Sequence, residues 1–131
     1  MFNLKSNCMN QFKDSGNGIV NRSFKFSLKI IDYCTVLENN KKQNMAYQLF
    51  RSGTSIGANV AEAQHAESMP DFIHKMKIAS KEASETAYWL SLCKESAHYP
   101  DPETLIYELE PIIKIVNKII ITSKHKIADK P

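Results

Sequence analysis

Cysteine is scarce in this chain of 131 residues, and the three that occur do not form a recognisable set. Cys8, Cys34 and Cys93 are odd in number, and no two are spaced as C-x-x-C. Small secreted domains use paired cysteines as a disulfide framework, and structural zinc sites use closely spaced cysteines and histidines. The sequence therefore predicts neither a disulfide framework nor a zinc site, and it favours a reducing environment.

Long apolar runs are also missing. A membrane-spanning helix needs about 20 consecutive apolar residues, and a secretory signal needs a continuous apolar stretch near the N-terminus. No run approaches the first length, and Lys5 with scattered polar residues interrupts the N-terminus. We therefore expect a soluble, cytoplasmic protein with no membrane partner.

Strong charge of one sign is absent as well. The formal net charge is +3, and 43% of the residues are hydrophobic and 24% charged, which is an ordinary globular composition for about one domain. A pI of about 8.7 permits contact with nucleic acid without requiring it. No zinc finger, RNP signature or other sequence-reading module occurs.

Helical periodicity is what the chain has in abundance. Four segments carry apolar residues at steps of three and four, and no segment with two-residue alternation competes with them. They begin near Asn21, Asn44, Ser68 and Asp101, and short polar or proline-containing turns separate them. The sequence therefore predicts an all-α, antiparallel, up-down-up-down four-helix bundle over residues 21–123. Residues 1–20 are expected to be a loosely ordered or docked tail, and residues 124–131 a basic tail.

The ends and apolar faces of the helices follow from local signals. In the first helix, Phe24, Leu28 and Ile31 form one apolar line, and Ile30, Tyr33 and Leu37 lie on its flank. Ser68 is a capping residue followed by Pro70 in the first turn of the third helix. In the fourth helix we expect Pro111 to produce a kink without ending the helix. The apolar seam predicted for the fourth helix is Leu105, Leu109, Ile112, Val116 and Ile119.

The stretch of residues 52–62 admits two interpretations. The segment 53–57 satisfies the G-x-S-x-G pattern, which would make Ser55 a hydrolase nucleophile at a strand-to-helix elbow. Residues 45–51 before it favour a helix, so the strand that such an elbow requires is missing. Within a helix, Gly53 and Gly57 instead form a smooth stripe that would let a neighbouring helix approach closely.

Two E-x-x-H motifs nominally fit a di-metal carboxylate bundle. Glu62 with His65 precedes the turn into the third helix, and Glu95 with His98 lies at the far end of that helix. The third helix is about 40 Å long by helix rise, so the two motifs cannot share a metal pair within one subunit. The sequence predicts no metal, no cofactor and no catalytic residue.

Polar and basic residues form two further sets. Carboxylates and small polar groups on facing helices are predicted to form a structural seam, because unpaired buried charges are costly. The predicted seam consists of Ser52, Ser55, Asn59, Glu62, Glu82 and Glu85. Basic residues recur in helical lines that could contact phosphates. The predicted nucleic-acid contacts are Lys25, Lys29, Arg51, His74, Lys77, Lys81, Lys114 and Lys118.

The signature R-S-x-x-S-I-x-A-N-x-A-E, within residues 49–63, resembles one family closely. With residues 71–76 and 79–86, it is similar to the bacterial four-helix-bundle proteins found in intervening sequences of 23S ribosomal RNA genes. The resemblance covers about residues 22–123. It implies a small cytoplasmic bundle that assembles into a ring-like homo-pentamer, has no enzymatic activity and is associated with nucleic acid.

A similar bundle is the accessory protein of diversity-generating retroelements, whose basic pentameric barrel binds nucleic acid and a reverse transcriptase. Five copies of the present chain would carry five times +3, or +15. The sequence thus leads to the hypothesis of a non-enzymatic oligomer that binds RNA or DNA through lysines. The alternatives are an adaptor ring that binds only a protein partner and a metal-dependent enzyme, which would hold tightly bound metal.

Overall fold

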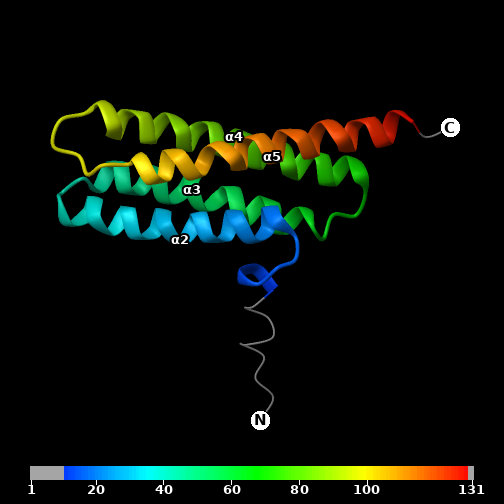
Figure 1. Cartoon of the computed structure of the whole chain (residues 1–131), viewed down its shortest axis with the longest axis horizontal. Helices are drawn as coiled ribbons and strands as arrows, with labels where there is room; N and C mark the ends of the chain where they lie inside the picture. The colour runs from blue at the N-terminus through cyan, green and yellow to red at the C-terminus, as the bar shows by residue number, and fades with distance from the viewer. Residues whose placement is uncertain (1–10, 130–131) are drawn as a thin grey trace, which may run out of the picture.

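The computed structural model describes residues 11–129, and long helices account for most of them (Figure 1). Helix α2 spans Gly18–Asn39, α3 spans Gln43–Ala63, α4 spans Met69–Glu95 and α5 spans Glu103–Ala128. No strand occurs within the described residues, and the all-α prediction is confirmed. Successive helices run in opposite directions and contact one another, and α5 also contacts α2. The buried apolar side chains of all four helices form one core.

Two helices begin where the sequence signals predict. The Ser68 hydroxyl accepts a hydrogen bond from the Asp71 backbone amide at 3.2 Å, which caps α4 as expected. A carboxylate oxygen of Asp101 accepts from the Glu103 amide at 3.0 Å at the start of α5. The sequence predicts that α3 begins near Asn44; it begins one residue earlier, at Gln43, and no side chain caps it.

Helices α2 and α5 are both longer than predicted. Helix α2 begins at Gly18, where the Asn17 side chain accepts a hydrogen bond from the Ile19 amide at 3.2 Å. The preceding residues dock on the bundle, since the Phe12 ring stacks on Phe24 with centroids 5.9 Å apart. Helix α5 continues to Ala128, so residues 124–128 are helical. Cys8 and the first ten residues of the predicted tail lie outside the described residues.

The prediction of the apolar face of α2 is wrong in one respect. Leu28 and Ile31 are 46% and 39% exposed, whereas Phe26, Ile30 and Leu37 are buried. Helix α2 carries apolar residues on two neighbouring faces, so periodicity alone could not tell which face meets the core. In α5 the four seam residues from Leu105 to Val116 are buried, but Ile120 is buried in place of Ile119. Pro111 lies inside α5, which continues through it as predicted.

The glycine stripe of α3 is a close-packing surface, as predicted. A Cβ atom placed on Gly53 would lie 2.8 Å from Cγ1 of Ile30, and one on Gly57 would lie 3.2 Å from the carbonyl oxygen of Ser23. Both contacts are with α2, which therefore packs directly against the backbone of α3. No helix within residues 11–129 is both long enough and apolar enough to cross a membrane.

Candidate nucleic-acid interface

The predicted polar seam connects α3 to α4 through a buried hydrogen bond. The hydroxyl of Thr86, a residue outside the predicted seam, donates to the Ser52 hydroxyl at 3.0 Å, and both side chains are fully buried. Thr86 also lies 2.8 Å from the backbone carbonyl oxygen of Glu82 in its own helix. Such a pair satisfies two buried polar groups and fixes how the helices align along their length.

Two ion pairs flank this hydrogen bond. Arg51 lies 2.5 Å from a carboxylate oxygen of Glu85, which also accepts a hydrogen bond from the Trp89 indole at 3.3 Å. Further along, Lys75 lies 3.0 Å from Glu62. Arg51, one of the predicted nucleic-acid contacts, is therefore engaged within the subunit.

The remaining seam residues bond locally. The Ser55 hydroxyl donates to the carbonyl of Arg51, and the Asn59 amide donates to the carbonyl of Ser55 at 2.8 Å. Both bonds lie within α3 and are the usual pattern for polar residues inside a helix. Ser55 sits in the middle of α3 and not at a strand-to-helix elbow. Oε2 of Glu82 is buried and has no hydrogen-bond partner among the described residues.

Groups that could perform chemistry are held in inert settings. Burial raises the pKa of the Cys34 thiol to about 11, with a further contribution from the Glu38 carboxylate, and burial also raises the pKa of Cys93. The reactive form of cysteine is the thiolate, so neither thiol is activated at neutral pH. Burial likewise raises the pKa of Tyr33, whose hydroxyl donates to the carbonyl of Pro100 at 2.6 Å.

The two E-x-x-H motifs remain separate. His65 follows the end of α3 and His98 follows the end of α4, so the length of α4 separates them. Within residues 11–129, no three His, Cys, Asp or Glu side chains are arranged so that they could hold a metal ion.

The eight predicted nucleic-acid contacts do not gather on one surface. His74, Lys77 and Lys81 are exposed along α4. Lys114 lies 3.4 Å from Glu110 one turn earlier on α5. Lys118 lines a separate groove between α4 and α5. Only Lys25 and Lys29 line a common cleft.

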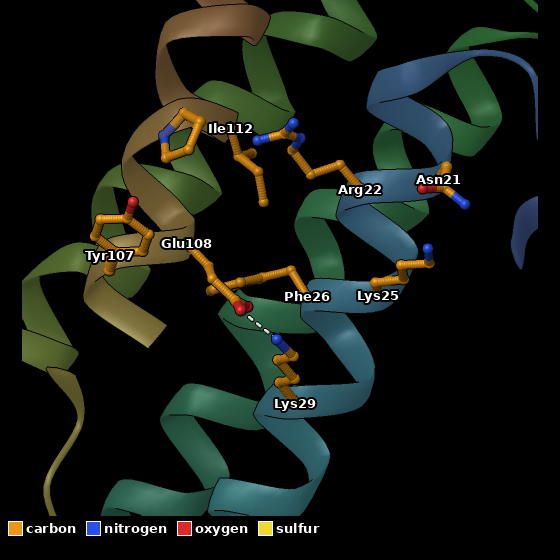
Figure 2. A pocket seen from close by; sticks show the side chains of 9 residues that line it. Asn21, Arg22, Lys25, Phe26, Lys29, Tyr107, Glu108 and Ile112 are labelled. Carbon is orange, nitrogen blue, oxygen red and sulfur yellow. Dashed lines mark hydrogen bonds and ion pairs between the residues drawn. The ribbon is translucent and has the colours of Figure 1, made fainter. Parts of the chain in front are cut away.

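That cleft lies between α2 and α5 and has a volume of about 320 Å³. Figure 2 shows Arg22 reaching from α2 towards α5, while the Lys25 amine is directed away from α5. Lys29 forms an ion pair with Glu108 across the cleft, and buried Phe26 lies beneath them. The cleft is lined by Asn21, Arg22, Lys25, Phe26, Lys29, Tyr107, Glu108, Pro111 and Ile112.

Two features give this cleft its chemistry. Among the described residues, no carboxylate lies within ion-pair distance of Arg22 or Lys25, so both cations are available to an anion. The Tyr107 ring on the α5 side is 78% exposed. Cations beside an exposed aromatic ring are the combination that binds phosphates and stacks on bases.

Arg22 and Tyr107 were missed in the sequence. Arg22 precedes Lys25 by three residues and Lys29 by seven, so it extends the same helical line by one turn. Tyr107 carries no such signal, because its place in the lining of the cleft depends on how α5 packs on α2.

Comparisons with known proteins agree on a family. The family described as 23S rRNA-intervening sequence protein matches residues 16–121. Among solved structures, the chain is similar to a protein of unknown function from the S23 ribosomal protein family of Bacteroides thetaiotaomicron. The two are 39% identical with a TM-score of 0.74, over 78% of this chain and 97% of that chain. A search of curated proteins finds no match.

Proposed function

Because the chain belongs to the family of 23S rRNA-intervening sequence proteins, we propose that it is a non-enzymatic, cytoplasmic protein that binds single-stranded RNA. The binding surface is the cleft between α2 and α5. DNA with an exposed single strand would present the same phosphates and bases. The observation that carries the proposal is that two cations without an ion pair among the described residues and one exposed tyrosine line the same cleft.

The cations provide the affinity. Arg22 and Lys25 are one turn apart on α2, so they can contact neighbouring phosphates of one strand. Each such ion pair with a phosphate releases condensed counterions, and binding therefore weakens as salt rises. Glu108 neutralises Lys29 and limits the positive charge at this cleft.

The tyrosine favours a single strand over a duplex. Stacking of a base on an aromatic ring contributes about 1–3 kcal/mol and needs a base that is not already stacked in a helix. Stacking on an aromatic ring tolerates every base, so we expect little preference for sequence.

Assembly would multiply these weak interactions. In this proposal the subunit is an antiparallel, up-down-up-down four-helix bundle, and five identical copies form a ring. Each copy contributes one cleft, so a long strand could engage several clefts at once and gain avidity. Support comes from family membership and from the large apolar side chains left exposed on α2 and α3.

The test is fluorescence anisotropy with the full chain, a labelled single-stranded RNA and a duplex of equal length at several salt concentrations. We expect tighter binding to the single strand and a linear fall of log K with log salt. The double variant Arg22→Ala/Lys25→Ala should reduce the salt slope by about 0.7 for each phosphate that is no longer neutralised. The matched control Lys77→Ala/Lys81→Ala removes two exposed cations of α4. If the control variant reduces the salt slope by the same amount, the cleft between α2 and α5 is not the binding surface.

The aromatic contribution is tested separately. Tyr107→Ala should weaken binding to the single strand about tenfold, because base stacking is worth roughly 1–3 kcal/mol. Tyr107→Phe keeps the ring and should bind like the unchanged protein. If the unchanged protein shows no RNA binding even at low salt, the proposed function is wrong.

A further inference from the structure

Helices α2 and α3 share an apolar surface that the core does not use. Its four large side chains are 46%, 39%, 67% and 49% exposed and are named here the outer face: Leu28, Ile31, Tyr47 and Phe50. Leu28 and Ile31 continue the helical line of Phe24 along α2, and Tyr47 lies about three turns before Ala58 on one line of α3, with Phe50 beside it. Phe24 in turn meets Ala58 of α3 in a shallow hollow between the two helices. Patches of this kind usually mark an interaction site.

At one end of the α2 part of the outer face, the nearest charged residues are acidic. Asp32 directly follows Ile31, Glu38 lies two turns further along α2, and both are exposed. Neither carboxylate takes part in an ion pair within residues 11–129. Lys25 lies towards the other end of this face, and Lys29, which directly follows Leu28, is paired with Glu108. The unpaired carboxylates of this face are therefore confined to the half beyond Ile31.

A second apolar surface lies between α4 and α5. It is a groove of about 600 Å³, named here the α4–α5 groove, whose apolar lining comes from Met69, Phe72, Ile115 and Ile119. Lys118 and Lys126 are the charged residues of its lining, and no carboxylate lines it. The whole of α5 from residue 111 to 128 contains no Asp or Glu.

These two surfaces complement each other in charge, and both are apolar. A groove against a groove would bring Lys118 and Lys126 close to their own copies. Like charges that face one another across an interface are costly, whereas opposite charges fix its register. A groove lined with apolar groups and lysines matches a surface of apolar groups and carboxylates.

We propose that the outer face of one copy docks in the α4–α5 groove of a second copy, with Asp32 and Glu38 beside Lys118 and Lys126. The inference rests on the self-association named in the proposed function and assigns the two surfaces that make it. Because the surfaces differ, the contact is head to tail, and each copy has one of each surface free for the next copy. Such contacts form a ring when the rotation between copies closes.

The test is the mass of the nuclease-treated full chain, measured by light scattering at low salt. The groove variant Lys118→Glu/Lys126→Glu and the face variant Asp32→Lys/Glu38→Lys should each raise the dissociation constant for self-association at least tenfold. Mixing the two variants should restore association between unlike copies, because the lysine face of one then meets the glutamate groove of the other. The two variants must alternate, so the restored assemblies are chains or rings with an even number of copies. The control Lys77→Glu/Lys81→Glu makes the same charge change on α4 and should associate like the unchanged chain. Circular dichroism checks that every variant is folded.

The outcomes separate this inference from the proposed function. If the groove variant still associates normally, or if the mixture does not recover, the assigned surfaces are wrong even where the protein assembles by another route. A monomeric unchanged chain would overturn both the ring and this contact. If RNA binding fails while the mixing result holds, the proposed function is wrong and the head-to-tail contact stands.

Discussion

Helix α2 meets its two neighbours in opposite ways. Against α3 it packs on Gly53 and Gly57, where even a methyl group would come within 2.8 Å of Ile30. Against α5 it presents Arg22 and Lys29, and a cleft of about 320 Å³ remains. The same helix is therefore closed on one side and open on the other, and the size of the facing side chains decides which.

The closed side carries a local cost that packing offsets. Two glycines inside a helix destabilise it by about 1 kcal/mol each relative to alanine. The close approach of α2 offsets this cost, because α2 makes dispersion contacts with the α3 backbone where the glycines have no side chain. The open side has no such constraint, so long polar side chains can occupy it and remain available to a ligand.

The largest expected effect comes from forcing the closed side apart. Gly53→Leu should lower the free energy of unfolding by about 3 kcal/mol, because the new side chain must displace Ile30 in a packed core. Urea denaturation at one fixed protein concentration measures this. The matched control is Gly18→Leu, since a Cβ atom there meets nothing within 4 Å. Equal stability of the two variants would show that α2 and α3 do not pack closely.

The closed side should also keep water from Cys34. Its thiol donates to the carbonyl of Ala46 at 3.4 Å, and burial raises its pKa to about 11 from an ordinary 9.0. At pH 8 its reaction with a thiol reagent should be about a hundredfold slower than that of a free thiol, because the thiolate is the reactive form. A Cys8→Ser variant removes the one cysteine outside the described residues, and guanidinium should expose the other two.

The same pKa shift has a consequence for stability. The folded state holds the neutral thiol more strongly than the unfolded state does, since the folded pKa is the higher. The contribution of Cys34 to stability is therefore complete below about pH 9 and is lost as the pH rises through about 11. If Cys34 of the folded protein reacted with the thiol reagent at pH 8 as fast as a free thiol, the contact between α2 and α3 would not be closed.

The contact of α3 with α4 is closed as well, and it contains a buried hydrogen bond between two side chains. Thr86→Val keeps the shape of the side chain and removes the donor to Ser52, which should cost about 1–2 kcal/mol. Thr35→Val is the matched control, because Thr35 is exposed and bonds only to the carbonyl of Ile31 in its own helix. A control as destabilised as Thr86→Val would mean that the buried pair has no special role.

The sequence predicts the closed parts of this molecule better than the open ones. Gly53 and Gly57 act through their missing side chains, and Ser68 acts through a hydroxyl that caps the next residues, so a local pattern reveals all three. The wrong face of α2 has a different origin, since Leu28 and Ile31 are as apolar as the residues that are buried. Only the position of the other helices decides which apolar face becomes the core.

The candidate site was only partly visible for the same reason. Lys25 and Lys29 stand out because they share one helix at a spacing of four. Tyr107 lies across the cleft on another helix, and no periodicity within one segment connects it with Arg22. Thr86 and Ser52 are likewise 34 residues apart in the chain. Contacts between helices depend on register and crossing, which local spacing does not specify.

The smallest expected effect on stability comes from a change on the open side of α2. This change should alter RNA binding more than stability, which distinguishes the open side from the closed one. Glu108→Gln removes the partner of Lys29, and such a surface ion pair contributes only about 0–1 kcal/mol. The same change frees a cation in the cleft, so single-stranded RNA should bind several-fold more tightly and with a salt slope steeper by about 0.7. Glu110→Gln is the control, because Glu110 pairs with Lys114 away from the cleft. If both variants bind RNA equally, net charge and not the cleft governs binding; if only Glu108→Gln gains affinity while both stay stable, the open side is the binding surface.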